Sequence, residues 1–469
     1  MLEASSGGEL AACIGGHSLG LGTFSPDTVE RAQDLHTGLP LSSFESGGRI
    51  IDREIHLLVR RLAAHGLLEY RLGSSLKAGD QVVIEPQMPS YWPRISPLDD
   101  SDVLVLSRFA YLRRRGHEMV LESPRAGALF RISDPQIVAA ITRLSTPQQI
   151  RTYRRGNAVA ELELLALLMD CRILFKTDPA REQDLRRDEG DDHLVFWDFH
   201  DLLFHVRSTE GRHANLSGGT YPYTNVIPPL PAVRPSWPGE KIDLQRLSDG
   251  GAQPVSPAAK LLRDRHSTRN FDDRRPITLA ELSQFLDGAV RVRTRWRGKL
   301  EELGEDGPEV EYAARPYPAG GAAYELELYL VVNKCEGLAR GFYHYDAGEH
   351  ALVPIAARTQ EIDAQLLASQ FAMGTPAPPQ ILIVIAARFG RISWKYSSIA
   401  YALILKDAGV LIQTLYLMAT SMGLGACAIG SVNLNLFAMM TGLEFHVEGP
   451  VGQFAIGRAG PPSPDERSA

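Results

Sequence analysis

Two arginines and a serine lie within five residues of one another in the sequence "RHSTRNF" at positions 265–271. A guanidinium group can bind two oxygens of a phosphate at once, and a serine hydroxyl can donate a further hydrogen bond to the same group. Arg265, Ser267 and Arg269 are therefore a candidate phosphate-binding motif. Short basic motifs also occur by chance, so an ordinary solvated surface turn is the alternative interpretation.

A helix is expected directly after this motif. In the sequence "ITLAELSQFLDGAV" (277–290), Thr278 and Glu281 have the spacing of a capping box. Ile277 and Leu282 are placed to form a hydrophobic staple across the same helix start. The pattern predicts a helix that begins about nine residues after the second arginine.

Apolar segments further along the chain predict a sheet covered by helices. Residues 322–332 and 380–389 have the alternation or the β-branched composition of core strands. Residues 408–430 form the most apolar long run, but Gln413 and Thr414 interrupt it, so we expect a buried helix and no membrane span. No G-x-G-x-x-G follows a strand and the βαβ spacing is irregular, which indicates an α+β domain without a Rossmann dinucleotide site.

The length of 469 residues exceeds what one hydrophobic core usually supports, and a Pro-, Gly- and Ser-rich segment divides the chain. Upstream of it, helix, helix and short strand occur in succession twice, which predicts two winged-helix-like units; ordinary helical subdomains are the alternative. The expected domains are residues 1–100 and 101–215 (the winged-helix-like units), 216–257 (a linker) and 258–462 (the catalytic domain).

Composition narrows the class of partner. The net charge of −7 argues against a nucleic-acid surface, which needs clustered Lys and Arg over a whole face. The four cysteines are far apart and show no metal-ligand spacing, so neither a metal site nor a disulfide framework is expected. The N-terminus lacks the pattern of a signal peptide. We therefore expect a cytoplasmic protein with reduced thiols and without a membrane or nucleic-acid partner.

The motif at Arg265, Ser267 and Arg269, with its capped helix, resembles the FMN-phosphate motif that begins the catalytic domain of the nitroreductase superfamily. Further segments resemble, in the same order, the SagB-type (McbC-like) azoline dehydrogenases, which oxidise peptide thiazolines and oxazolines to thiazoles and oxazoles. These segments are residues 314–332, 341–352, 394–425 and 451–458. Residues 196–213 resemble the segment before this domain, and the N-terminal region resembles the peptide-clamp domains of cyanobactin oxidases.

The resemblance implies a homodimer with FMN at the subunit interface. Arg265, Ser267 and Arg269 are then expected to hold the phosphate, the ribityl chain and the pyrimidine edge. Arg458 is expected to approach the phosphate from the C-terminal end of the domain, and a surface arginine is the alternative for this residue. The chemistry implied for the cofactor is hydride acceptance.

Two glycine-containing loops match flavin-binding positions of the family. Pro318, Ala319 and Gly320 match a loop that approaches the flavin of the other subunit, where the family often has serine in place of Ala319. Gly430 matches the residue whose backbone N–H faces flavin N5. Nitroreductases commonly have glutamate where this chain has Ile429, which suggests a different substrate. Helix ends and packing are the alternative explanation for these glycines.

Lys395 and Tyr396 match a Lys-Tyr pair of the azoline dehydrogenases, which implies that they are the catalytic residues. Ring oxidation removes a proton as well as a hydride, so a positioned base is required. Trp394 could stack on a flat heterocycle. The alternative is a lysine in a salt bridge beside a core aromatic side chain.

The resemblance thus predicts an FMN-dependent oxidoreductase that oxidises azoline rings in a precursor peptide during the maturation of ribosomal peptide natural products, with a cyclodehydratase as a possible partner. A nitroreductase or flavin reductase fed by NAD(P)H, and a non-enzymatic peptide-binding scaffold, are the alternatives. The first 250 residues contain no clustered catalytic groups, so we expect them to bind peptide. The strands expected at "HGLLEYRL" (65–72) and "CRILFKTD" (171–178) are candidates for pairing with it.

Overall fold

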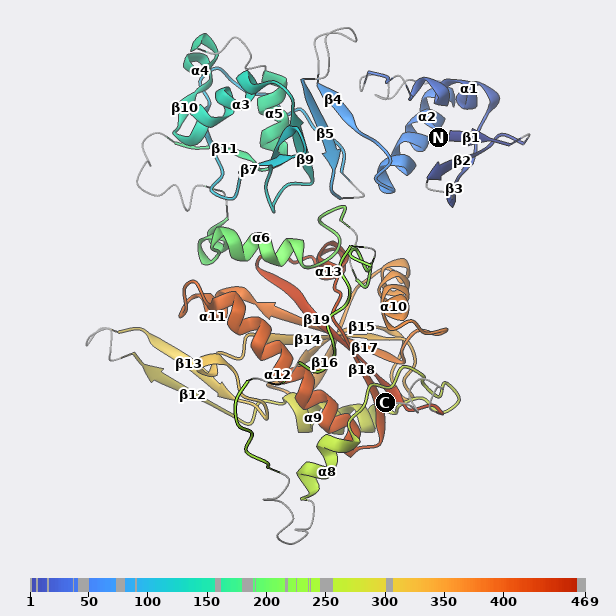
Figure 1. Cartoon of the computed structure of the whole chain (residues 1–469), viewed down its shortest axis with the longest axis vertical. Helices are drawn as coiled ribbons and strands as arrows, with labels where there is room; N and C mark the ends of the chain where they lie inside the picture. Colours follow the sequence, from blue (N-terminus) through green and yellow to red (C-terminus); the bar gives the residue numbers. More distant parts are fainter. Residues whose placement is uncertain are drawn as a thin grey trace. The chain divides into compact units, whose positions relative to one another are not determined.

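The computed structural model forms two compact units (Figure 1). The N-terminal unit comprises Met1–Val195, Phe199–Arg207 and Gly211–Asn215, and the C-terminal unit comprises Phe196–Asp198, Ser208–Glu210 and Leu216–Ala469. The structure describes residues 2–5, 7–14, 17–36, 38–40, 50–72, 81–88, 91–156, 162–178, 189, 191–215, 218–224, 226–234, 236, 238–244, 256–300 and 307–461. The finer domain limits derived from the sequence remain a prediction.

The N-terminal unit mixes short strands and helices. Its strands are β1 (Leu2–Ala4), β2 (Glu9–Ile14), β3 (His17–Thr23), β4 (Tyr70–Leu72), β5 (Val82–Pro86), β6 (Val103–Leu106), β7 (Tyr111–Arg115), β8 (Glu118–Glu122), β9 (Ala128–Ile132), β10 (Gln148–Gln149) and β11 (Leu174–Lys176). Its helices are α1 (Pro26–Asp34), α2 (Ile50–Ala64), α3 (Pro135–Thr142), α4 (Ile150–Gly156), α5 (Leu162–Asp170) and α6 (Phe199–Arg207), with 3₁₀ turns η2 (Arg143–Ser145) and η4 (Asp192–Phe196).

Three antiparallel sheets organise this unit, in the orders β1-β2-β3, β4-β5-β9-β8-β7 and β10-β6-β11. The apolar side of α2 is buried against the first sheet, with Ile55 and Leu58 fully enclosed. The unit is richer in strands than the sequence indicated, because its hairpins are short. Arg115 and Glu118, for example, are joined by a two-residue turn at Gly116, whose φ is +63°.

The C-terminal unit contains the longer elements. Its strands are β12 (Thr294–Lys299), β13 (Glu309–Ala314), β14 (Leu326–Val332), β15 (Gly341–Asp346), β16 (Ala351–Ile355), β17 (Ile381–Arg388), β18 (Leu424–Ile429) and β19 (Glu448–Arg458). Its helices are α8 (Pro257–Asp264), α9 (Leu279–Val290), α10 (Thr359–Met373), α11 (Phe389–Ser393), α12 (Ala400–Ser421) and α13 (Leu434–Thr441), with the 3₁₀ turn η6 (Gly320–Ala322).

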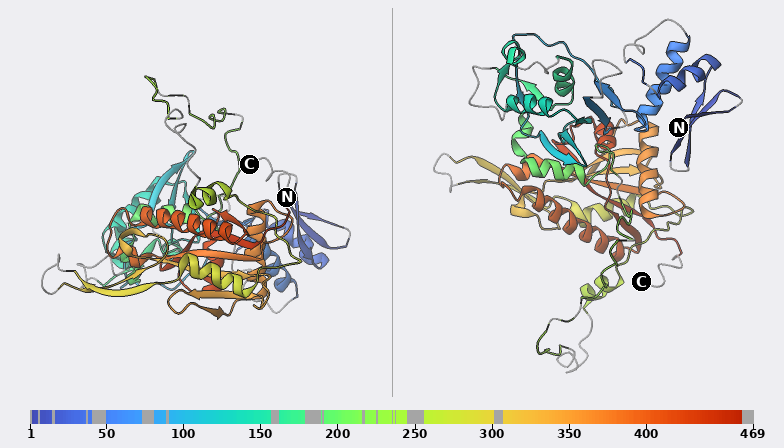
Figure 2. Two further views of the ribbon diagram at one scale, coloured as in Figure 1. Left: turned by 90° about the horizontal axis from the view of Figure 1, so that it is seen from below. Right: turned by 45° about the horizontal axis from the view of Figure 1, so that its top comes forward.

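A six-stranded antiparallel sheet in the order β16-β15-β14-β17-β19-β18 forms the centre of this unit. On one face, Leu382 and Val384 of β17 pack with side chains of α10 and α13. On the other face, Phe454 of β19 contacts Phe285 of α9 and Tyr416 of α12. The hairpin β12–β13 extends from the unit as a separate two-stranded ribbon (Figure 2). This arrangement confirms the predicted α+β class with helices on both faces of the sheet.

The sequence suggested one buried helix for the apolar run at residues 408–430. The structure instead divides this run into a helix and a strand. Helix α12 ends at Ser421, Gly423 adopts a φ of +68°, and the following residues form β18 at the edge of the sheet. Composition alone did not separate a buried helix from an adjoining buried strand. By length and composition α12 also passes the test for a membrane span, a test that core helices pass as well.

Candidate active site

The motif at residues 265–268 lies along the free edge of β18. This strand pairs with β19 on one side. On its other side, the Thr268 N–H donates a hydrogen bond of 2.7 Å to the carbonyl oxygen of Ala426. Because this bond covers an otherwise unpaired strand edge, it fixes the motif on the sheet.

Tyr416 of α12 orients the Ser267 hydroxyl. The Tyr416 hydroxyl oxygen accepts the Ala428 N–H at 2.7 Å and lies 2.8 Å from Ser267 Oγ. With the tyrosine proton directed at Ser267, the serine hydroxyl keeps its own proton for another acceptor. The sequence analysis missed Tyr416, because nothing in its local sequence distinguishes it from a core aromatic residue.

Arg265 lies beside the same tyrosine. Its guanidinium carbon is 5.2 Å from the centroid of the Tyr416 ring, within the range of a cation–π contact. The side chain of Arg269 is exposed, whereas the intervening Thr268 is buried. The structure therefore brings Arg265 and Ser267 together on Tyr416 and leaves the side chain of Arg269 on the surface.

Gly430 follows the same edge of β18. Ala426 and Ala428 use their outward backbone groups for the bonds described above, and residues two apart in a strand direct these groups to the same side. The Gly430 N–H is thus expected on the side of Ser267. A Cβ atom added at Gly430 would have none of the described atoms within 4 Å. The Ile429 side chain is instead buried in the core beneath α10, so it does not shape this edge.

Arg458 forms an ion pair with an acidic residue of its own domain. Its Nη2 lies 2.6 Å from both carboxylate oxygens of Glu281, the capping residue of α9. Its hydrogen bond to Glu281 is the main cause that lowers the pKa of that carboxyl group. The predicted phosphate contact of Arg458 therefore competes with an ion pair inside the domain.

Lys395 and Tyr396 follow the short helix α11 on the surface of the C-terminal unit. Lys395 Nζ lies 5.3 Å from the centroid of the Tyr396 ring. Lys395 is exposed, as is Trp394, half of whose surface is accessible. Trp197 packs its ring 4.5 Å from that of Phe389, and its Nε1 donates to the His446 carbonyl oxygen at 2.8 Å. These contacts anchor the start of α11 and hence the residues that follow it.

The loop that contains Pro318, Ala319 and Gly320 lies against the Lys-Tyr pair of the same chain. A Cβ atom added at Gly321 would overlap the hydroxyl oxygen of Tyr396 and lie 2.8 Å from Lys395 Nζ. A side chain at Gly321 would therefore force the ends of both side chains to shift. The structure thus joins two sets of candidate residues that are about 75 positions apart in the sequence.

The backbone of this loop is strained and tightly held. Gly321, Ala322 and Tyr324 all have positive φ angles, of +57°, +55° and +47°. Non-glycine residues adopt such angles at a cost, and they do so mainly where surrounding contacts impose them. The Asp407 carboxylate accepts the Gly320 N–H at 2.8 Å, and Arg391 Nε donates to the Ala323 carbonyl oxygen at 2.9 Å.

Helix α12 separates the two groups of candidate residues. Asp407, which binds the loop, and Tyr416, which binds Ser267, are nine positions apart on this helix. At ~1.5 Å and ~100° per residue, they lie about 13 Å apart along the axis and about half a turn apart around it. The chain therefore presents the Arg265–Ser267 group and the Lys395–Tyr396 group in different directions.

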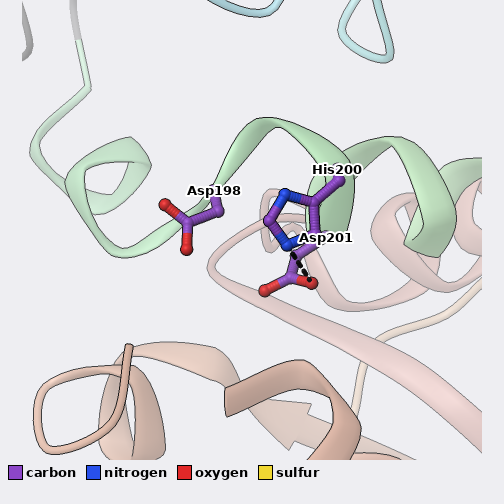
Figure 3. A group of neighbouring side chains, drawn as sticks. All are labelled: Asp198, His200 and Asp201. Carbon is purple, nitrogen blue, oxygen red and sulfur yellow. Dashed lines mark ion pairs between the residues drawn. The ribbon is translucent and has the colours of Figure 1, made fainter. Parts of the chain in front are cut away.

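One group of potential metal ligands occurs in the part of the chain that the structure describes. Atoms of Asp198, His200 and Asp201 lie within 4.8 Å of one another (Figure 3). His200 Nε2 is 3.4 Å from an Asp201 oxygen, and the histidine is exposed. This geometry is that of a surface ion pair and carries no metal assignment.

Comparison with known proteins adds a second line of information. The model of the Nitroreductase family matches residues 262–458. The Methanocaldococcus jannaschii protein MJ1384, which is named as a nitroreductase, is 30% identical over 156 residues, or 33% of this chain and 70% of that protein. The chain belongs to the nitroreductase family. Membership places it among oxidoreductases and confirms the fold expected for its C-terminal domain.

A second family model matches the part of the chain that precedes the nitroreductase domain. The model described as "Cyanobactin oxidase ThcOx" matches residues 104–214. The two models occur in the order that the sequence predicted, which confirms the resemblance to peptide-modifying oxidases of this family.

Solved structures also show partial likeness to this nitroreductase-family chain. The Escherichia coli microcin synthetase McbBCD complex with truncated pro-MccB17 has 20% identity, with 58% of this chain and 97% of that one covered and a TM-score of 0.41. A nitroreductase from Ralstonia eutropha has 23% identity, with 45% and 87% covered and a TM-score of 0.34. A nitroreductase with bound FMN from Bacteroides fragilis has 13% identity, with 44% and 89% covered and a TM-score of 0.26.

Proposed function

We propose that the chain is an FMN-dependent dehydrogenase that oxidises thiazoline and oxazoline rings of a ribosomally made peptide to thiazoles and oxazoles. The observation that carries the proposal is the contact of Gly321 with both Lys395 and Tyr396. It places a candidate acid–base pair against a glycine loop of the type that can approach a planar ring. The cyanobactin oxidase match at residues 104–214 supports a peptide as the substrate.

The residues at the edge of β18 fit the phosphate end of FMN. Arg265 supplies a charge, and Tyr416 holds Ser267 so that its hydroxyl can donate to an anion. The open space beside Gly430 fits the approach of a flat ring to a backbone N–H. Bound FMN would supply a hydride acceptor for the ring carbon. Arg269 and Arg458 complete the proposed set, Arg458 only if it leaves Glu281.

Lys395 and Tyr396 are proposed to manage the proton. Converting an azoline into an azole removes a hydride from one ring carbon and a proton from its neighbour. Lys395 Nζ takes the proton, and the Tyr396 hydroxyl donates a hydrogen bond to the ring heteroatom. The exposed Trp394 offers an aromatic face on which the heterocycle can stack. Because Lys395 is exposed in the single chain, water must be excluded when cofactor and substrate are bound.

A homodimer is part of the proposal, because the two residue groups are connected to α12 through Tyr416 and Asp407, which lie half a turn apart on this helix. The Lys395–Tyr396 group of one chain and the Arg265–Ser267 group of another can face one flavin, whereas the same groups of one chain point in different directions. Two apolar side chains on α12, Leu405 and Val410, are more than a third exposed. These side chains would lose contact with water if a second subunit covered this side of α12.

The N-terminal unit is proposed to bind the substrate peptide. Both strands that the sequence named for this role, β4 and β11, are edge strands of their sheets. Edge strands offer unpaired backbone groups to an extended peptide. Hydrogen exchange on adding the peptide should protect β4 or β11; protection confined to the C-terminal unit would assign the N-terminal unit another role.

An NAD(P)H-dependent nitroreductase is the second candidate function, and membership of the nitroreductase family favours it. Two assays of the same purified protein distinguish these functions. Purified protein with added FMN is given either an azoline-containing peptide under air or a nitroarene with NAD(P)H. Mass spectrometry should show the loss of two hydrogens per ring from the peptide. Rapid nitroarene reduction with an unchanged peptide would favour the second function.

A further inference from the structure

Glu325 is a buried acidic residue for which the proposed mechanism has no use. It stands directly before β14, and none of its surface is accessible. Among the described residues, no other residue donates a hydrogen bond to either of its carboxylate oxygens, and its own backbone N–H lowers its pKa only in part against the effect of burial. A lone carboxylate in such a place is very costly, so this side chain needs either a donor or a proton of its own.

Asp407 of α12 is the acidic neighbour of Glu325. Burial is the largest cause that raises the pKa of Glu325, to about 7, and the negative charge of Asp407 adds to it. As two ionised groups the carboxylates can only repel, because neither has a hydrogen to donate. A proton on Glu325 converts this repulsion into a hydrogen bond from Glu325 to Asp407.

Asp407 also holds the loop at the candidate active site. Its Oδ2 accepts the Gly320 N–H at 2.8 Å. The next residue, Gly321, is the one that contacts Lys395 and Tyr396. A chain of direct contacts therefore runs from Glu325 through Asp407 and the loop to the catalytic pair.

We propose that Glu325 carries a proton shared with Asp407, and that this acid pair is a positioning device that holds the loop of residues 319–324 against Lys395 and Tyr396. The shared proton is a property of this chain and does not depend on the proposed function. The positioning role rests on the proposed function. The strained φ angles of Ala322 and Tyr324 agree with a loop that is imposed from outside, since such a backbone relaxes when its contacts are removed.

Arg315 is a cation that interacts with Glu325 of the acid pair. Arg315, four residues before Ala319, lowers the pKa of Glu325 but donates its own hydrogen bond to the Leu326 carbonyl oxygen. Among the described residues, Tyr317 interacts electrostatically with Glu325, Glu327 and Tyr324, and Arg391, Lys395 and Tyr396 contact the loop. Arg315 reduces the charge repulsion without supplying a bond to either oxygen of Glu325.

The shared proton is tested by infrared spectroscopy of the protein without substrate. At pH 6, the difference between wild type and Glu325→Gln should contain the carbonyl stretching band of a protonated carboxylic acid. Glu361→Gln is the matched control, because Glu361 is also buried but is bonded to Arg358. It should leave that band in place. If Glu325→Gln removes no such band, the shared proton is refuted, whatever the enzyme does.

The positioning role is tested by kinetics per bound flavin. Glu325→Gln retains a donor toward Asp407, so its kcat should stay within about threefold of wild type. Asp407→Ala releases Gly320 and should lower kcat about tenfold or more, with little change in the KM for the peptide. Equal kcat for Asp407→Ala and wild type would refute the role. If Asp407→Ala does not fold, Asp407→Asn is measured in its place. Its side-chain oxygen can still accept the Gly320 N–H, so its kcat should equal that of wild type. A tenfold loss of kcat in Asp407→Asn would also refute the positioning role.

Discussion

The hydroxyl groups of Ser267 and Tyr416 lie 2.8 Å apart, and the tyrosine is already engaged by the Ala428 N–H. A residue of the candidate phosphate motif is thus fixed by a side chain 149 positions further along the chain. This pair ties the motif, helix α12 and the edge of β18 into one unit.

Tyr416→Phe should weaken FMN binding. The change removes the partner of Ser267 and leaves the Ala428 N–H without an acceptor, at a cost of about 1 to 3 kcal/mol shared between stability and affinity. Titration of the apoprotein with FMN, followed by flavin fluorescence, should show a dissociation constant raised several-fold. Tyr312→Phe, on the separate β12–β13 hairpin, is the control and should bind FMN as wild type does. If both variants bind FMN with equal affinity, Tyr416 has no role in FMN binding.

Arg265→Ala should have a larger effect on the same titration. It deletes a charge-assisted hydrogen bond of about 1.5 to 3 kcal/mol, which corresponds to a loss of roughly tenfold to a hundredfold in affinity. Arg263→Ala, two positions away and exposed on α8, is the matched control and should bind normally. Similar losses from both variants would indicate a general effect of charge, and no effect from either would refute the phosphate motif.

Gly321→Ala should slow ring oxidation while FMN stays bound. The new methyl group would displace Tyr396 and Lys395, and the φ of +57° adds strain. Gly374→Ala separates the two causes, because Gly374 has a φ of +67° but no described atom within 4 Å of an added Cβ. Both variants should lose roughly 1 kcal/mol of stability. Only Gly321→Ala should lose kcat, and an equal kcat for the two would contradict the role proposed for the contact with Lys395 and Tyr396.

The pH dependence of stability should report the acid pair. The pKa of Glu325 is about 7 in the folded protein against 4.5 for an unperturbed glutamate. Between these values the folded state holds a proton that the unfolded state has lost, so the free energy of unfolding falls as pH rises, by up to about 3 kcal/mol. Glu325→Gln lacks this proton. Urea unfolding between pH 5 and pH 8 should show Glu325→Gln gaining stability relative to wild type; a constant difference would contradict the raised pKa.

Local signals in the sequence were sufficient for much of the C-terminal fold. The capping box of Thr278 and Glu281 is formed, with both of its hydrogen bonds, and Ile277 and Leu282 are fully buried beside it. Such features depend on residues three to five positions apart and on their periodicity, which a sequence displays directly. The core strands β14 and β17 were found for the same reason.

The long-range contacts that form the candidate site could not be predicted from these local signals. Glu325 and Asp407 are 82 positions apart, and their proximity depends on how α12 crosses the sheet. The pairing of Arg458 with Glu281 likewise joins the last strand, β19, to helix α9, from positions that are far apart in the sequence. The resemblance supplied candidate residues, whereas the fold showed which of them meet.

Lys395 is the proposed base for ring oxidation, and its alanine variant distinguishes this role from a structural one. Lys395→Ala should keep bound FMN and the dimer but oxidise an azoline-containing peptide ~10²-fold more slowly, the scale of a lost general base. Lys334→Ala, another exposed lysine of the same domain, is the matched control and should oxidise the peptide normally. The measurement is the rate at which the peptide loses two hydrogens per ring, followed by mass spectrometry. A hundredfold loss confined to Lys395→Ala is the predicted result, and oxidation by Lys395→Ala at the wild-type rate would contradict the account.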